Sequence, residues 1–417
     1  MSMYQFFSFN IFLVTIITCV FYNIYSCGFN MFSSAYSVVS TSILLDNVSF
    51  YLIILVVCLG VYSQMCFYNY LSNSTKLFII LSLIFSICCF CTTNIILFWC
   101  FYELSMLPLL FLIFKDSPYS ERFIAGWYFA AYLLVTSLPL LLILMYLGLM
   151  NNSLNFNCWV VNYDNWWLLI VLSFIFFTKV PLCPFHTWLP IVHAEATSIV
   201  SIFLSGYIMK LGLLGVYRCA FFIFNTSMLE YLCVCLMASI LFFVVSSSEL
   251  DGKRWLAFLS LAHIVVPFLG LYICDWDCTS LIFIYCFGHG LSAGLVFGVL
   301  WYFYELCNSR NWLLVKSGVS GKNSMFLLII SLLSLCSFPT SLQFFCEVQL
   351  VTQSSFSLLY WFFWCWYLFI GGLVPLILCG FTMIRCECIE SHSFSFYPFY
   401  LFLFFMIVWC FGGILIL

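Results

Sequence analysis

Charged residues are scarce in this sequence. Lysine, arginine, aspartate and glutamate make up only 6% of the 417 residues, whereas 65% are hydrophobic and the mean hydropathy is +1.17. A soluble domain carries about 25% charged residues, so water is not the main solvent of this chain. The net charge of −3 is spread thinly without a basic block, which argues against a nucleic-acid-binding protein.

We also expect no cleavable targeting peptide at the start of this sequence. Residues 1–25 have neither the cationic start and small-residue cleavage site of a signal peptide nor the arginine-rich amphipathic character of a transit peptide. We therefore expect a protein that is synthesised beside its final membrane, in an organelle or a bacterium.

Ligand spacings typical of a metal site are missing too, although 24 cysteines are present. Cys88 and Cys91 form a C-x-x-C pair, but no second pair follows at zinc or iron–sulfur spacing. His186 and His193 lie seven residues apart, and we expect Pro190 to interrupt the helix that zinc ligands would need. We interpret the cysteines as small apolar residues and expect no metal on this chain.

What the sequence does contain is a series of long apolar runs. About 20 apolar residues cross a bilayer as a helix, and lipid forces the backbone groups of each crossing to pair within it. The fold class that we predict is all-α, a polytopic membrane bundle of about thirteen helices. The stretch 26–44, rich in serine and asparagine, is expected to be a loop. The expected spans lie near 4–25, 49–70, 77–92, 94–114, 123–149, 166–190, 195–218, 228–247, 252–273, 277–304, 325–353, 357–384 and 397–417.

Loop charges sort to one side of this map, as the positive-inside rule requires. The side that carries most of the basic residues is assigned to the cytoplasm or the matrix. That side holds Lys76, Lys115, Arg122, Lys253, Arg254, Arg310, Lys316, Lys322 and Arg385, and the opposite side holds Arg218 with Asp164, Glu230, Asp275 and Asp277.

Six ionisable side chains lie where charge is expensive, near the middle of expected spans. An ionised side chain at the centre of a membrane helix costs at least about 2.5–3.5 kcal/mol, which pairing and internal water can offset. Burial lowers the pKa of a lysine and raises that of a carboxylate, and a nearby opposite charge reverses both shifts, so such groups suit proton relay. Ion pairs that only fix helix packing are the alternative interpretation. The six are Glu103, Lys179, Lys210, His263, His289 and Glu347.

Prolines predict that two of the spans are broken. Pro181 and Pro184 follow Lys179 closely, and Pro339 precedes Glu347 by eight residues. Proline lacks the N–H that a helix needs and clashes with the preceding turn. Two interrupted helices in corresponding halves are typical of an inverted-repeat transporter, and kinks for packing alone are the alternative. We divide the chain into N-terminal helices (1–76), a first repeat (77–218), a second repeat (228–384) and a C-terminal helix (397–417).

Several motifs follow one another along the chain. The most specific are Lys179-Val-Pro-Leu through His186-Thr-Trp-Leu-Pro190, His193-Ala-Glu-Ala196 and Lys210-Leu-Gly-Leu-Leu-Gly215. Support comes from Tyr102-Glu103-Leu-Ser-Met-Leu-Pro108, Asp251-Gly-Lys253, His289-Gly290-Leu-Ser292 and Phe338-Pro339-Thr340. In these motifs, from about residue 46 to the end, the chain resembles the chain 4 family of NADH–ubiquinone oxidoreductase, antiporter-like subunits of respiratory complex I.

The resemblance implies an axis of proton transfer through the membrane interior. Glu103 matches a carboxylate paired with Lys179 on the first broken helix, and Glu347 matches the end of the axis on the second. Between them lie Lys210, His263 and His289, with His186, His193, Glu195 and Lys253 in supporting positions and Pro181, Pro184 and Pro339 at the breaks. The chain departs from the family at Ile191, Thr197 and Cys346, in place of the usual lysine, proline and glycine.

By the same resemblance, NADH oxidation and quinone reduction take place on other subunits. Those partners would hold the flavin, the iron–sulfur clusters and the quinone, and this chain would hold no cofactor. Its neighbours would be other membrane-arm subunits, including sister antiporter-like chains, in the mitochondrial inner membrane or alternatively a bacterial plasma membrane. Two other functions stay open: a cation/proton antiporter subunit of the same fold, and a structural membrane scaffold.

Overall fold

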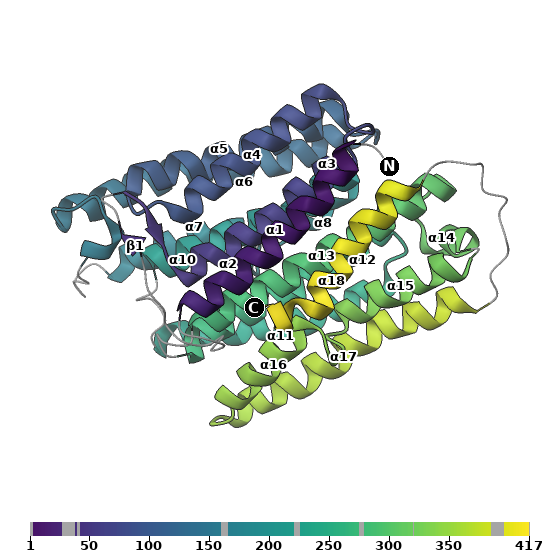
Figure 1. Ribbon diagram of the computed structural model, residues 1–417. Coiled ribbons are helices and arrows are strands. Elements are labelled where there is room, and N and C mark those ends of the chain that lie inside the picture. The colour runs from purple at the N-terminus through teal and green to yellow at the C-terminus, as the bar shows by residue number, and fades with distance from the viewer. Residues whose placement is uncertain are drawn as a thin grey trace.

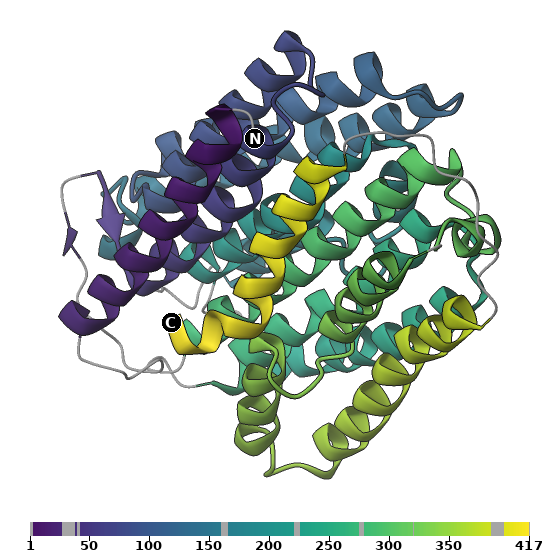
Figure 2. The ribbon, with the colours of Figure 1, turned by 45° about the vertical axis from the view of Figure 1, so that its right-hand side comes forward.

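A computed structural model of the chain describes residues 3–26, 38–39, 42–159, 166–220, 226–274, 279–319, 321–384 and 396–416. Long helices lying roughly side by side form one bundle, seen from two directions in Figures 1 and 2. Two short strands, β1 (Val38–Val39) and β2 (Leu44–Leu45), pair in antiparallel fashion. The predicted all-α membrane bundle is confirmed.

Eleven helical spans within the described residues are long and apolar enough to cross a membrane, and each coincides with an expected span. Two of them contain a π-helical turn, η1 (Val57–Val61) or η4 (Leu204–Ile208). The spans are α1 (Met3–Ser26), α2 (Asn47–Val56) with η1 and α3 (Tyr62–Cys66), α4 (Asn73–Cys91), α5 (Ile95–Asp116), α6 (Arg122–Met150), α9 (Ser198–Phe203) with η4 and α10 (Met209–Cys219), α11 (Thr226–Ser248), α12 (Gly252–Ile273), α13 (Thr279–Cys307), α17 (Leu358–Met383) and α18 (Tyr397–Ile416).

Outside these spans lie a 3₁₀ turn, η2 (Phe156–Cys158), and a short helix, α14 (Trp312–Gly318). Most of the loop expected at 26–44 falls outside the described residues, as do four of the sorted loop charges, Arg385, Asp164, Asp275 and Asp277.

The first of the two remaining spans is broken where prolines predicted it. Helix α7 (Trp166–Lys179) ends at the buried lysine, and α8 (Trp188–Glu195) begins after the segment that contains Pro181 and Pro184. One expectation is wrong, because Pro190 does not interrupt a helix. It lies in the first turn of α8, where its missing N–H would have no intrahelical partner anyway.

The second break separates α15 (Lys322–Leu335) from α16 (Leu342–Gln353), with Pro339 between them. Ser337 and Thr340 beside this proline have φ angles of 49° and 91°. Residues other than glycine rarely adopt such left-handed angles, so the second break is a strained stretch of backbone held by its surroundings.

Side-chain caps fix where several helices begin. Asn94, Asp251 and Ser341 cap α5, α12 and α16 by accepting hydrogen bonds from backbone N–H groups of the first turn. Each of these three helices carries one of the ionisable residues identified above. The caps therefore help to set the height at which those side chains lie in the bundle.

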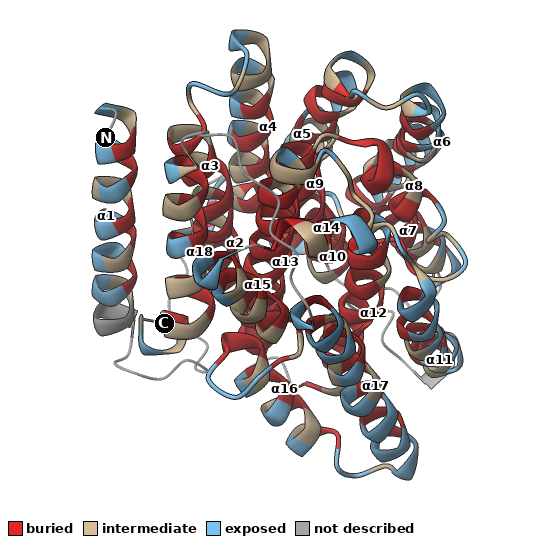
Figure 3. Cartoon of the chain, turned by 90° about the vertical axis from the view of Figure 1, so that its right-hand side faces the viewer, coloured by how far each residue is buried: buried red, intermediate tan, exposed pale blue. Residues whose placement is uncertain are grey.

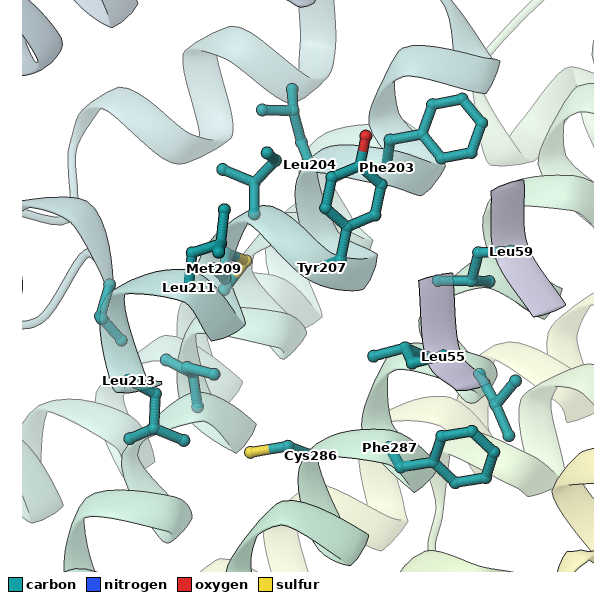
Figure 4. Packing of buried hydrophobic residues seen from close by; sticks show 14 of the residues in the cluster. Leu55, Leu59, Phe203, Leu204, Tyr207, Met209, Leu211, Leu213, Cys286 and Phe287 are labelled. Atoms are coloured by element: carbon teal, nitrogen blue, oxygen red, sulfur yellow. The ribbon is translucent and has the colours of Figure 1, made fainter. Parts of the chain in front are cut away.

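Helix α13 lies at the centre of the bundle, and its most apolar stretch is completely buried by other helices (Figure 3). Glycines let α2 and η1 approach it closely: a Cβ added to Gly290 would lie 2.8 Å from Leu55 Cδ1 on α2, and one added to Gly294 would lie 2.5 Å from Leu59 Cδ2 on η1. Figure 4 shows both leucines within this apolar packing. The small residues around His289 thus allow close helix packing.

Ion pairs at the two ends of the bundle test the order of the spans. At the basic end, Arg310 Nε lies 3.5 Å from Asp251 Oδ2, and Arg310 Nη1 lies 3.8 Å from Glu195 Oε1. At the opposite end, Arg218 Nη2 lies 3.2 Å from Asp46 Oδ1. These contacts place the ends of several spans on the sides that the charge map predicted.

Candidate functional site

The first cluster of buried charges joins the middle of α5 to the broken helix. Lys179 is the last residue of α7, and its Nζ donates to Glu103 Oε1 at 3.4 Å. Nζ also donates to the Leu133 carbonyl at 3.4 Å and lies 5.4 Å from the centroid of the Tyr102 ring. The lysine side chain is 3% exposed and the glutamate side chain 14%. The structure therefore brings the two expected partners together inside the bundle.

The second cluster centres on Lys210 in α10. Its Nζ donates to the Ser205 carbonyl at 2.5 Å and lies 3.0 Å from His289 Nδ1. Ser205 belongs to the π-helical turn η4, where the regular helix pairing is interrupted, and such turns are frequent at functional sites. Lys210 and His289 are both buried, so the lysine depends on these two acceptors for the hydrogen bonds that water would otherwise supply.

His263 on α12 continues this cluster. Its ring centroid lies 5.6 Å from that of His289, and its Nδ1 lies 2.6 Å from the Tyr367 hydroxyl. Nε2 of each histidine is buried without a hydrogen-bond partner among the residues that the structure describes. Buried polar atoms of this kind are uncommon and call for a functional explanation.

Glu347 on α16 ends the line, surrounded by neutral polar groups. Its Oε1 accepts hydrogen bonds from Ser337 Oγ at 2.9 Å and from Gln343 Nε2 at 3.1 Å. Gln343 Nε2 also lies 3.3 Å from His263 Nδ1 and 3.3 Å from the Tyr285 hydroxyl. The glutamate is only 2% exposed. One hydrogen-bonded network therefore contains both His263 and Glu347.

Sequence reasoning missed three members of this network, Gln343, Tyr285 and Tyr367. They are neutral, so nothing in the sequence marks them as costly to bury. Spacing could have found two of them, because Gln343 lies four residues before Glu347 and Tyr285 four residues before His289. Residues four apart share one face of a helix. Tyr367 comes from α17 and had no such signal.

The two clusters are adjacent, but their lysines are not hydrogen-bonded to each other. No hydrogen bond joins Lys179 to Lys210 in the described part of the chain, yet the helices that carry them are in contact. A Cβ added to Gly212 on α10 would lie 2.4 Å from Val180 Cγ2 and 3.4 Å from Lys179 Cβ. Proton transfer between the two lysines would therefore need a mobile group or internal water.

His193 and Lys253 lie between the basic end and the second cluster. The His193 ring is fully buried, stacks on Phe297 with centroids 5.0 Å apart, and has both nitrogens without a partner among the described residues. Lys253 is buried and its Nζ donates to the Ala196 carbonyl at 2.7 Å.

Two expected supporting residues lie away from the line. Glu195, the last residue of α8, pairs with Arg310 at the basic end and so links α8 to the segment that contains Arg310. His186 lies half-buried within the first break, and its ring centroid is 4.7 Å from that of Phe242.

The span of the chain that contains both breaks also carries a family signature. A model of the NADH:quinone oxidoreductase/Mrp antiporter transmembrane family matches residues 92–373. The chain belongs to this family. The matched range includes Glu103, both breaks and Glu347, and it confirms the kinship that the motifs predicted.

Curated animal relatives carry the name NADH-ubiquinone oxidoreductase chain 4. The protein of Locusta migratoria is 33% identical over 246 residues, which are 57% of this chain and 54% of that relative. The protein of Artemia franciscana is 32% identical over 285 residues, 67% of this chain and 71% of that relative. The chain spans 54% to 65% of the length of the first three relatives. With the apolar helices, these animal relatives support a multi-pass protein of the mitochondrial inner membrane, as expected.

Solved structures share the fold of this family member. A chain of respiratory complex I from Thermus thermophilus superposes with a TM-score of 0.80 at 16% identity, covering 98% of this chain and 93% of that one. A chain of the Mrp complex from Dietzia sp. gives 0.75 at 14% identity, covering 94% and 76%. Both solved chains are parts of multi-subunit membrane complexes.

Proposed function

We propose that this chain is a proton-translocating membrane subunit of respiratory complex I, and thereby part of an NADH:ubiquinone reductase. The observation that carries the proposal is a set of titratable side chains buried on contacting helices at the bundle centre. Ionisable residues inside a membrane protein cost several kcal/mol when unpaired, and by default they mark an ion pathway. Family membership and the chain 4 relatives support the same function.

At the first cluster, the distance between two side chains controls proton occupancy. Glu103 and Lys179 favour each other's charged forms while they are in contact. When Nζ moves away from the carboxylate, the glutamate binds a proton more readily and the lysine releases one more readily. Movement of one side chain thus takes up or releases a proton without help from a cofactor.

At the second cluster, a proton can pass among neighbouring groups. Lys210 Nζ is within hydrogen-bonding distance of His289, and His289 faces His263. An imidazole can bind a proton at one nitrogen and release it from the other, which suits it to relay. Glu347 is the acceptor at the end of this line.

The redox chemistry belongs to partner subunits in this proposal. Partners would hold the flavin, the iron–sulfur clusters and the quinone, and would include other membrane-arm subunits and sister antiporter-like chains. The likeness in fold to chains of two multi-subunit complexes supports such partners.

We also propose that 77–218 and 228–384 are inverted repeats, with 1–76 and 397–417 as flanking helices. The two breaks, α7 to α8 and α15 to α16, support this division. Each break lies beside one of the buried titratable residues, Lys179 or Glu347.

Two other functions lead to different measurements. A cation/proton antiporter subunit, favoured by the likeness to an Mrp chain, would show sodium-dependent transport in the purified complex. A structural scaffold would keep full activity when its buried charges are replaced by neutral side chains of similar volume.

The proposed function is tested at the first cluster. We expect Glu103→Gln and Lys179→Met each to abolish proton translocation and the turnover linked to it while the complex still assembles. The exposed Glu230 provides the control, because Glu230→Gln also removes a carboxylate but lies outside the line. The measurements are the rate of vesicle acidification driven by NADH and quinone and the rate of NADH oxidation, at matched content of the purified complex. Unimpaired translocation in both cluster variants would contradict the proposal.

A further inference from the structure

Two tyrosine hydroxyls fill the space between His263 and Glu347. The Tyr367 hydroxyl lies 2.6 Å from His263 Nδ1 and 3.2 Å from the Tyr285 hydroxyl. The Tyr285 hydroxyl and Glu347 Oε1 lie beside the same amide nitrogen, Gln343 Nε2, at 3.3 Å and 3.1 Å. All four side chains are buried, and they come from α12, α17, α13 and α16. The tertiary fold therefore places a row of polar atoms away from bulk solvent. This row, called the file below, runs from His263 Nδ1 through the Tyr367 and Tyr285 hydroxyls to the Glu347 carboxylate.

Gln343 also bridges His263 and Glu347, but its amide group cannot relay a proton as a hydroxyl can. Its NH₂ group carries two hydrogens to donate and no free lone pair that accepts a passing proton. His263 Nδ1, the Tyr285 hydroxyl and Glu347 Oε1 all lie within 3.3 Å of Nε2, so its two hydrogens cannot bond to all three at once. Ser292 Oγ donates to Gln343 Oε1 at 3.4 Å, which orients Nε2 toward the other network members.

We propose that Tyr367 and Tyr285 relay protons between His263 and Glu347. This inference rests on the proposed function of the chain. In one direction, protonated His263 gives its Nδ1 hydrogen to the Tyr367 oxygen, and Tyr367 gives its own hydrogen to the Tyr285 oxygen. Tyr285 then gives its hydrogen to the Glu347 carboxylate. His263 loses one proton, Glu347 gains one, and both tyrosines remain neutral.

The protonation state of His263 sets the direction of the file. When Nδ1 is unprotonated, it accepts from Tyr367, Tyr367 accepts from Tyr285, and the file points toward the histidine. When Nδ1 carries a hydrogen, both hydroxyls turn and the file points toward Glu347. Reversal therefore requires rotation of two O–H bonds and no movement of a helix.

The relay is tested by removing one hydroxyl at a time. Tyr367→Phe and Tyr285→Phe keep the ring and its packing, and each is made in the full chain within the assembled complex. We expect each variant to lower proton translocation at least about tenfold, within the range known for positioned proton-transfer groups. Because the hydroxyls act in series, the double variant should be no slower than the slower single variant. The measurement is the rate of vesicle acidification driven by NADH and quinone at matched complex content.

Tyr302 supplies a control, because its hydroxyl lies 3.0 Å from the Tyr400 hydroxyl in a second, partly buried tyrosine pair outside the line. Tyr302→Phe should leave translocation unchanged. Normal translocation in both relay variants overturns the relay, as does an equal loss in the Tyr302 variant. If Glu103→Gln still abolishes translocation in that case, only the relay fails. If Glu103→Gln is also without effect, the proposed function fails with it.

Discussion

The carboxylates beside the two helix breaks are held in opposite ways. At the first, Glu103 is paired with the ammonium group of Lys179 at 3.4 Å. At the second, Glu347 accepts from the neutral donors Ser337 and Gln343, and no lysine or arginine pairs with it in the described part of the chain. The first carboxylate retains some exposure, whereas the second is almost completely buried.

The same backbone device, a helix broken at a proline, therefore lies beside carboxylates in two different electrostatic settings. An ion pair couples its proton occupancy to the distance between the partners, so it responds to movement. A carboxylate among neutral donors has no such partner, and its buried charge is best removed by binding a proton. The first break is suited to a switch and the second to a terminal acceptor.

Reversing one charge at the first break should have the largest effect. Glu103→Lys places two ammonium groups together inside the bundle, and an uncompensated buried charge costs about 3–5 kcal/mol. We expect little assembled complex, and we expect the double variant Glu103→Lys with Lys179→Glu to recover much of it. The amount of the chain in the intact complex, separated on native gels, is the measurement. Normal assembly of the single variant would show that the two side chains are not a pair.

Neutralising the second carboxylate should affect transport without affecting assembly. Glutamine in Glu347→Gln can still accept from Ser337 through its carbonyl oxygen, and no cation is left unpaired, but it cannot bind a proton. We expect translocation to fall at least about tenfold, or ~1.4 kcal/mol in activation free energy. The exposed Glu305 offers the control Glu305→Gln, measured in the same vesicles. A loss of assembly in Glu347→Gln would remove the contrast between the two breaks.

The parts of the site that the sequence predicted are those with a local signal. Charge inside an apolar run and proline inside a helix can both be seen without knowing any tertiary contact. They located Lys179, Glu347 and both breaks, although Pro190 was misread because a proline in the first helical turn costs nothing. The thirteen expected spans match the eleven unbroken spans and the two broken ones for the same reason.

The parts that the sequence could not predict depend on contacts between distant segments. Tyr367 meets His263 across 104 residues, and Arg218 meets Asp46 across 172. Neutral side chains such as Gln343 are common enough in membrane helices that only their neighbours reveal a role. The separation of the line into two clusters is likewise a tertiary fact, since it depends on how α7 packs against α10.

The smallest effect expected is that of placing glycine at Cys346, directly before Glu347. Cys346 is buried within α16, and glycine there removes a small apolar side chain and loosens the helix, which costs about 1–2 kcal/mol in stability. If neutral donors hold Glu347 in place, a looser α16 weakens that hold. Cys346→Gly should therefore slow translocation about threefold, equal to about 0.6 kcal/mol.

Cys235 gives the matched control for this change, because it is equally buried in α11, away from the line of titratable groups. Cys235→Gly should lower the thermal stability of the complex by a similar amount and leave translocation unchanged. Equal translocation in the two variants would mean that Glu347 does not depend on the rigidity of its helix. The second break would then differ from the first only in the charge of the groups around its carboxylate. The rigidity of the helix that carries the carboxylate would not distinguish the two breaks.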